Sequence, residues 1–339
     1  MTLLFIDGFD HYGEAGSQPL DKGYSEFGTS SVYVNFVTGR FGYGQAFEST
    51  DNNGYITKDL GVNKSTIYFG VAIKKDETGA ISANINYPFL TLEDESGVDQ
   101  VRFCLNSSYG INAYRDTTLL GSSADGVFRD LYWQYLEVKV IISATVGEVT
   151  VRINETQVLN LTSQNTKNGS DYIRYIRFRG INLDKVTHYD DLYIDDAQFH
   201  GDCRVRTFVP DSISSANNSF TASAGAKDEC VDETISNEDT DYIYSDTLNH
   251  KQGFGITTGA LGTVKAVQLN HHCRVDAGGT RKITPIIRSN STDYSGTETD
   301  VIPDEYKFES EIWETDPDDS GAWTQTKLEA AEFGLEITT

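Results

Sequence analysis

The chain has 339 residues, with 51 Asp and Glu against 27 Lys and Arg, so its formal net charge is -24. A chain this acidic lacks the clustered cations that bind phosphates or an anionic membrane surface, which argues against nucleic acid and membrane as partners. Aromatic residues make up 12% of the chain, which argues against disorder, and 30 Gly with 6 Pro indicate a turn-rich β protein.

Alternation of apolar and polar residues predicts strands through the first 200 positions. Within Tyr132–Ile142, alternate residues including Leu136, Val138 and Val140 form an apolar face, which is typical of a strand with one side in a core. Many short strands without a helical period predict a two-sheet sandwich or jelly roll. The clearest candidates are Ser65–Ile73, Val101–Leu105, Tyr132–Ile142, Glu148–Ile153, Tyr172–Phe178 and Asp191–Ala197.

The composition changes near residue 202, which predicts two domains, residues 1–202 and 203–339. The Ser/Ala/Asn-rich segment Pro210–Gly225 is typical of a linker or long surface loop. Trp323–Ala331 predicts one short helix, and the remaining pattern predicts a smaller β-sandwich-like domain. Its expected strands are Asp241–Tyr244, Val264–Leu269, Ile283–Ile287, Glu305–Ile312 and Phe333–Ile337.

Three segments of the first domain carry a resemblance to a known family: Phe5–Asp10, Gly39–Phe47 and Tyr189–Asp196. With Trp133–Ile142 and Glu148–Asn154 between them, their order resembles the concanavalin A-like or laminin-G-like jelly roll of bacteriophage structural proteins. The resemblance implies that Tyr189–Asp196 is the last strand of the domain and pairs beside the first. In the second domain, residues 312–324 and 328–335 resemble the C-terminal domains of tailed-phage virion proteins.

The resemblance implies a structural component of a tailed-phage virion: a tail, fibre or capsid-decorating protein, and not an enzyme. It implies assembly in the bacterial host cytoplasm, other virion proteins as partners, a homo-oligomer and contact with host surface glycans. Two alternatives stay open. One is a carbohydrate-binding adhesin or receptor-binding protein. The other, a glycan depolymerase, is less favoured because no strand presents the E-x-D-x-(x)-E pattern of paired carboxylates.

Acidic residues gather at both ends of the first domain. Asp7 and Asp10 lie near its start, and Asp190, Asp191, Asp195 and Asp196 flank its last predicted strand. If these strands are neighbours, the carboxylates converge, and Ca²⁺ takes six to eight oxygen ligands of this kind. The alternative is that the acids end strands and cap turns. The calcium candidates are Asp7, Asp10, Asp191 and Asp195.

Other polar clusters have less specific interpretations. Asn106–Gly110 and Tyr114–Asp116 place Tyr beside polar groups, as a glycan site would, although an aromatic residue in a β protein is more often part of the packing. Trp133 is expected to be structural. The triplet Glu93–Glu95 is typical of a solvated turn between strands.

The histidines and cysteines give no metal-site signature. His271 and Cys273 share one face of a predicted strand while His272 lies on the other, so a structural role is expected. Reduced thiols are the default for Cys104, Cys203, Cys230 and Cys273, with a Cys203–Cys230 bridge as the alternative.

Overall fold

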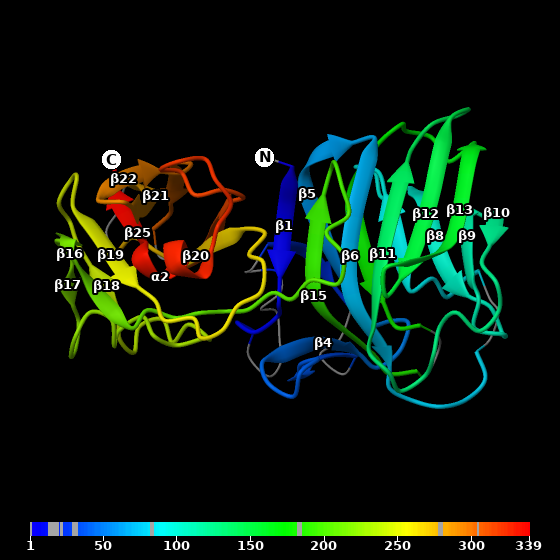
Figure 1. Cartoon of the computed structure of the whole chain (residues 1–339), viewed down its shortest axis with the longest axis horizontal. Helices are drawn as coiled ribbons and strands as arrows, with labels where there is room; N and C mark the ends of the chain where they lie inside the picture. The colour runs from blue at the N-terminus through cyan, green and yellow to red at the C-terminus, as the bar shows by residue number, and fades with distance from the viewer. Residues whose placement is uncertain are drawn as a thin grey trace. The chain divides into compact units, whose positions relative to one another are not determined.

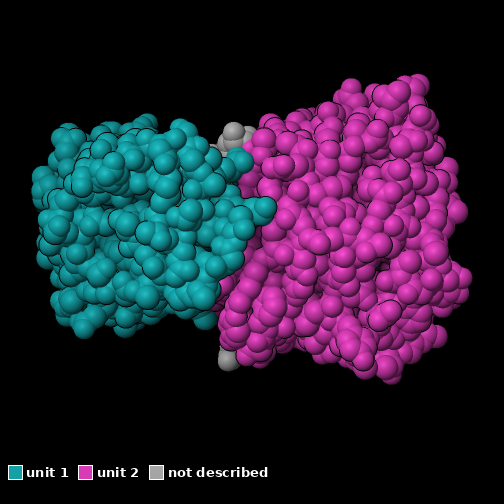
Figure 2. All heavy atoms as spheres, in the orientation of Figure 1, with its two compact units in different colours: residues 1, 207–339 teal, residues 2–206 magenta. Residues whose placement is uncertain are grey.

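The computed structural model describes residues 2–12, 20, 23–28, 33–81, 85–181, 185–276, 281–303 and 305–339. The chain divides into two compact units, residues 2–206 and 207–339, which Figure 2 shows in separate colours. The sequence composition places the domain boundary at about residue 202, and the contacts within the fold place it after Arg206.

The first unit contains two antiparallel sheets (Figure 1). One has the order β13-β12-β11-β6-β15-β4-β3, with β1 also paired to β15, and the other has the order β10-β9-β8-β7-β14-β5-β2. The first sheet comprises β1 (Leu3–Asp7), β3 (Val34–Thr38), β4 (Gln45–Ser49), β6 (Thr66–Lys75), β11 (Gln134–Ile141), β12 (Gly147–Ile153), β13 (Thr156–Gln164) and β15 (Thr187–Asp195). The second comprises β2 (Tyr24–Phe27), β5 (Tyr55–Lys64), β7 (Leu90–Glu93), β8 (Asp99–Leu105), β9 (Ile111–Arg115), β10 (Thr118–Ser122) and β14 (Ile173–Arg179).

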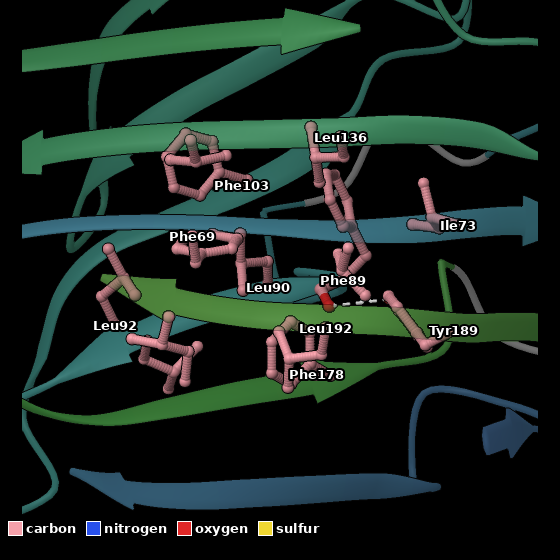
Figure 3. Close-up of a cluster of buried hydrophobic side chains, with 14 of the residues drawn as sticks. Phe69, Ile73, Phe89, Leu90, Leu92, Phe103, Leu136, Phe178, Tyr189 and Leu192 are labelled. Atoms are coloured by element: carbon pink, nitrogen blue, oxygen red, sulfur yellow. Dashed lines mark hydrogen bonds between the residues drawn. The ribbon is translucent and has the colours of Figure 1, made fainter. Parts of the chain in front are cut away.

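The core of this unit lies between the two sheets, because each strand turns its apolar residues toward the other sheet. Phe69 and Leu136 come from the first sheet, Phe103 and Phe178 from the second, and all four are buried (Figure 3). The Tyr189 hydroxyl donates a hydrogen bond to the Phe89 carbonyl at 3.1 Å, which satisfies a polar group inside this core. The all-β sandwich predicted from the sequence is confirmed.

Two pairings in the eight-stranded sheet involve strands that the sequence predicts. Strands β11 and β12 form a hairpin in which Val138 lies opposite Val151. Strand β15 pairs with β1, with Leu3 opposite Asp195 and Asp7 opposite Leu192. The first and last strands of the sandwich are therefore neighbours, as the family resemblance implies.

The second unit is built on a six-stranded antiparallel sheet of order β16-β19-β25-β21-β22, with β23 also paired to β21. Its strands are β16 (Ser212–Asn218), β19 (Lys251–Gly255), β21 (Arg281–Ser289), β22 (Thr292–Ser295), β23 (Thr299–Val301) and β25 (Glu332–Ile337). Two further ribbons pair β17 (Thr221–Ala222) with β18 (Ile243–Tyr244), and β20 (Val267–Cys273) with β24 (Lys307–Trp313).

One short helix, α2 (Gln325–Ala330), packs Leu328 against the second core, which also contains Ile287, Trp323 and Phe333. Thr324 caps the helix by accepting a hydrogen bond from the Lys327 amide. No helix among the described residues is long and apolar enough to cross a membrane.

The structure corrects the prediction of a linker and decides the state of the cysteines. Pro210–Gly225 is not a linker, because it contains β16 and β17. Ser212 and Ile213 pair with Gly255 and Phe254 of β19. At the irregularity that follows, the Ser214 hydroxyl accepts from the amides of Ala216 and Asn217. All four cysteines are unbridged, so the Cys203–Cys230 disulfide is not formed.

Candidate functional site: an arginine-rich sheet face

The outer face of the seven-stranded sheet, opposite the core, carries most of its charged side chains. Residues directly opposite one another in neighbouring strands point to the same face. The register therefore places one row of side chains across six strands: Glu26 (β2), Thr57 (β5), Arg177 (β14), Thr91 (β7), Arg102 (β8) and Tyr114 (β9). We call this row, together with Tyr55, Glu93, Asn112 and Arg179 on the same face, the arginine face.

Arg177 at the centre of the arginine face is fully occupied. Its guanidinium donates to the Thr57 hydroxyl at 2.9 Å and to Glu26 at 2.7 Å, and it lies 2.7 Å from the Glu93 carboxylate. Three partners on three strands hold this side chain in place, so Arg177 acts as the structural centre of the face.

Arg179, two residues along the same strand, has a different environment. Its guanidinium forms no hydrogen bond or ion pair with any described residue, and its Nε atom is buried without a partner. It lies 5.1 Å from the centre of the Tyr55 ring, whose centre is also 5.0 Å from the Arg177 guanidinium. Burial and the neighbouring Arg177 charge lower the pKa of Arg179. The charges of Glu93 and Asp99 act in the opposite direction, but neither acid forms an ion pair with the Arg179 guanidinium. A mostly buried cation without a paired carboxylate is poorly solvated and attracts an anion.

Further polar atoms on the arginine face are buried without partners. They are the Thr91 hydroxyl oxygen, Nε of Arg102 and Oδ1 of Asn112. The Asn112 amide donates to the Tyr114 hydroxyl at 3.1 Å, and Arg102 pairs with Asp99 and Asp116. Buried polar groups in folded proteins are nearly always satisfied, so several open ones on a single face indicate a surface that meets a polar ligand.

Glu93 is the buried acid of the arginine face, with 1% of its surface exposed. Burial raises its pKa to about 7, although Arg177 acts in the opposite direction. The interpretation of Glu93–Glu95 as a solvated turn is therefore wrong for its first two residues. Glu93 pairs with Arg177. Asp94 is also buried, and its carboxylate is satisfied there by hydrogen bonds from the amides of Ser96 and Val98.

The composition of the arginine face suits an acidic sugar polymer. An open guanidinium binds a carboxylate through paired hydrogen bonds. Tyr55 and Tyr114 provide aromatic surface for the apolar face of a sugar ring, and Thr91 and Asn112 offer partners for hydroxyl groups. Neighbouring strands lie about 4.8 Å apart, so the three strand steps from Arg177 to Tyr114 extend roughly 14 Å.

The calcium candidates occupy three separate settings. Asp7 accepts hydrogen bonds from the hydroxyls of Tyr12 and Tyr24, at 2.8 and 3.0 Å, and burial followed by the Asp7 charge raises the pKa of both phenols. Asp195 accepts from the amides of Ala197 and Gln198. Because Asp7 and Asp195 lie opposite Leu192 and Leu3, the antiparallel pairing places these two carboxylates at opposite ends of the β1–β15 ladder.

Asp10 and Asp191 do lie in one neighbourhood, together with Asp190. Asp10 accepts from the Gln45 amide at 2.9 Å, Asp191 accepts from the Val205 amide at 2.8 Å, and Arg40 lies 3.6 Å from Asp191. Burial, followed by the Asp191 charge, raises the pKa of Asp190. Among the described residues no group of three or more His, Cys, Asp or Glu side chains is arranged to hold a metal ion, so the predicted calcium set is not assembled there.

The remaining sequence candidates take mainly structural positions. Asn106 holds its own turn by accepting the Ser108 and Gly110 amides, and the Tyr109 hydroxyl donates to Asp130 at 2.7 Å. Tyr114 is the exception, because it belongs to the arginine face. His271 is buried in β20, and burial lowers its pKa to about 4.

The predictions from the sequence do not include the arginines of this face, although the sequence holds a signal for them. In Ile173-Arg-Tyr-Ile-Arg-Phe-Arg179, Arg177 and Arg179 are two positions apart around the core residue Phe178, so both must point away from the core. The charge alternation therefore predicts a cationic strand face. It does not predict which arginine finds an acid.

Comparisons with known proteins concern the fold. No family model and no curated protein matches the sequence. Among solved structures, an endo-β-1,4-glucuronan lyase from the fungus Trichoderma reesei is similar over 52% of this chain and 92% of that chain, with 11% identity and a TM-score of 0.41. Alginate lyase Aly36B is similar over 58% and 98%, with 11% identity and a TM-score of 0.38. A Trypanosoma rangeli sialidase is similar over 59% and 31%, with 9% identity and a TM-score of 0.39.

These structures contradict the prediction that the chain is not an enzyme, because polysaccharide lyases and sialidases are among the proteins with a similar fold. We withdraw that prediction. Likeness at this identity assigns no activity to the chain, since one fold serves many functions.

Proposed function

We propose that the chain is a carbohydrate-binding protein whose arginine face binds an acidic polysaccharide that carries uronate carboxylates. The observation that carries this proposal is Arg179, a mostly buried guanidinium with neither hydrogen bond nor ion pair among the described residues. A uronate carboxylate supplies the hydrogen-bonded partner that the Arg179 guanidinium lacks, and the sugar ring and hydroxyls match the tyrosines and open polar atoms beside it.

Titration of the full chain with polyuronates tests the proposal. Polyglucuronate and alginate are the probes, and a neutral glucan of similar length is the comparison polymer. We expect the polyuronates to bind and the neutral glucan not to bind. We also expect binding to weaken as salt is added, because the contact is between opposite charges.

The variant Arg179→Gln removes the open charge and keeps a polar side chain of similar reach. A hydrogen bond to a charged group contributes about 1.5–3 kcal/mol, which corresponds to roughly 10- to 100-fold weaker binding. We expect thermal stability to stay unchanged or to rise, because the variant removes an unpaired buried charge. Calorimetric titration gives the affinity, and a melting curve gives the stability.

Arg174→Gln is the matched control on the same strand. Arg174 already pairs with Asp59, so its loss should leave polyuronate binding within about twofold of the wild type. The proposal fails if no polyuronate binds, or if Arg179→Gln binds as tightly as the wild type. Assaying the same mixtures for new reducing ends shows whether binding leads to cleavage, as a depolymerase requires.

The virion role stays a prediction from the sequence motifs, together with its virion-protein partners and homo-oligomeric state. It is compatible with glycan binding, because a part of a phage particle that contacts the host surface meets polysaccharide. Mass spectrometry of purified particles tests it directly: the chain must be present at a defined stoichiometry.

A further inference from the structure

A hollow of about 470 Å³ lies in the first unit, at the start of β11. It is lined by the segment that precedes β11 and by the turn between β12 and β13, strands that lie side by side in Figure 1. These strands belong to the eight-stranded sheet, so the hollow is separate from the arginine face. Its volume is within the range of about 300–1,000 Å³ that is typical of small-ligand sites.

Gln134 in the lining of the hollow is a polar residue in an apolar position. It lies two residues before the core residue Leu136, so the strand points both side chains to the core side of the sheet. Only 3% of Gln134 is exposed, and both its amide oxygen and its amide nitrogen are buried without a hydrogen-bond partner. A ligand that donates one hydrogen bond and accepts another would satisfy both atoms.

The rim of the hollow supplies aromatic surface and hydrogen-bond donors. Tyr132 is 67% exposed, and Trp133 beside it is half-buried, with the Lys74 ammonium 5.4 Å from its ring. Arg129 is exposed, and its guanidinium has no hydrogen bond or ion pair with a described residue. Trp133, for which the sequence predicts a structural role, thus also lines the hollow.

Hydrogen bonds fix the walls of the hollow, and none of them uses the side-chain amide of Gln134. Asn154 in the β12–β13 turn exchanges two hydrogen bonds with the backbone of Tyr135, both 2.8 Å long. On the other side, the buried Lys75 ammonium donates to Asp130 at 2.9 Å, and the Leu131 amide donates to the Lys75 carbonyl. A site with fixed walls binds without a large ordering cost.

We propose that this hollow binds one neutral sugar unit through two adjacent hydroxyl groups. The Gln134 amide nitrogen donates to one hydroxyl, and the amide oxygen accepts from the other. The Tyr132 ring covers the apolar face of the sugar. The Gln134 amide is neutral and offers one donor group and one acceptor group, so it suits two hydroxyl groups of a ligand better than it suits a ligand carboxylate. This site therefore differs from the arginine face in ligand chemistry.

The test uses the full chain and methyl glycosides of glucose, galactose, mannose and N-acetylglucosamine as probes. Ligand-detected NMR and calorimetric titration measure binding. We expect saturable binding of at least one probe, and loss of binding when either of the two adjacent hydroxyls of that probe is replaced by hydrogen. Gln134→Leu should weaken binding at least tenfold while the protein stays as stable as the wild type or becomes more stable, because Leu suits the apolar position.

Tyr132→Ala should also weaken binding several-fold, whereas Tyr244→Ala, which removes a tyrosine that is 51% exposed in the other unit, should not. Arg179→Gln should leave methyl glycoside binding unchanged, which separates this site from the proposed polyuronate site. The proposal is overturned if no glycoside binds saturably, since the hollow then holds only water. It is equally overturned if Gln134→Leu binds a glycoside as the wild type does.

Discussion

The four acids of β15 and its end show how strongly the surroundings of a residue decide its chemistry. Burial of Asp195 acts to raise its pKa, but the hydrogen bonds from His200 and two backbone amides outweigh burial. The net result is a lowered pKa. Asp190 and Asp191 are buried beside each other, near Asp10 and Arg40, and their pKa values are raised. The pKa values of residues of one type, four or five positions apart in one strand, are therefore shifted in opposite directions.

Stability should fall with rising pH because of Asp190 and Asp191. Burial raises the pKa of Asp190 from 3.8 to about 8, so between these values the folded chain binds more protons than the unfolded chain. The free energy of unfolding contributed by the pair is therefore highest near pH 4 and decreases toward pH 8. Asp190→Asn should flatten this decrease, which urea unfolding at a series of pH values measures.

Asp196→Asn is the control for this pH effect. Asp196 is partly exposed and pairs with Lys64 at 2.7 Å, so its loss should leave the pH slope between 4 and 8 as it is in the wild type. An Asp190→Asn protein with the wild-type slope would show that the buried pair does not set the pH dependence.

At the scale of elements, the packing of aromatic rings on the outer face of the eight-stranded sheet explains why β6 has a glycine at position 70. Tyr135 and Tyr193 lie stacked, with ring centres 6.4 Å apart. Their hydroxyls donate to the Asp191 carbonyl and to Glu137, at 2.9 and 2.7 Å. These hydrogen bonds hold both rings in place. The rings occupy the space beside β6 that a side chain at position 70 would need, so this position of β6 is a glycine.

Gly70→Ala should therefore destabilise the first unit. A methyl group at this position would clash with the Tyr193 ring and lie 2.7 Å from Cε1 of Tyr135. Overpacking of this kind costs about 1–3 kcal/mol, which outweighs the usual advantage of Ala over Gly in a strand. Denaturant unfolding monitored by circular dichroism gives the change.

Gly262→Ala is the matched control, because no atom lies within 4 Å of the added methyl group. It should change the free energy of unfolding by no more than about 0.5 kcal/mol. If Gly70→Ala proved as stable as Gly262→Ala, the two tyrosine rings would have to be free to move, against the hydrogen bonds that hold them.

At the scale of the whole molecule, each of the two units has a hydrophobic core of its own among the described residues. The first is formed by the two sheets of residues 2–206, and the second by Trp323, Leu328 and their neighbours within residues 207–339. Both units are within the usual size of independently folding domains. A change in one core should therefore leave the other core folded.

We expect the fragments 1–206 and 207–339 to fold separately. Each should show a cooperative thermal transition, and Gly70→Ala should lower the transition of the first fragment only. Differential scanning calorimetry of both fragments and of the full chain measures this. A fragment that lacks a cooperative transition would show that its core depends on the other unit.

The sequence by itself determined the β-rich character of the chain and the faces of its strongest strands. Alternation places Leu136 and Val138 in the core, and the helix near the end of the chain lies within the predicted Trp323–Ala331. Periodicity succeeds here because burial of one strand face is a local property. It fails at Pro210–Gly225, where edge-strand hydrogen bonds outweigh a loop-like composition.

Only the tertiary structure decided the candidate site. The sequence places Arg177 and Arg179 on one face, but it does not show that Arg177 pairs with Glu26, 151 residues away, while Arg179 forms no ion pair with a described residue. The family resemblance places Asp7 and Asp195 on adjacent strands, whereas the antiparallel register puts the two carboxylates at opposite ends of the strand pair. Charge partners depend on contacts between residues distant in the chain, and a local pattern of residue types does not contain that information.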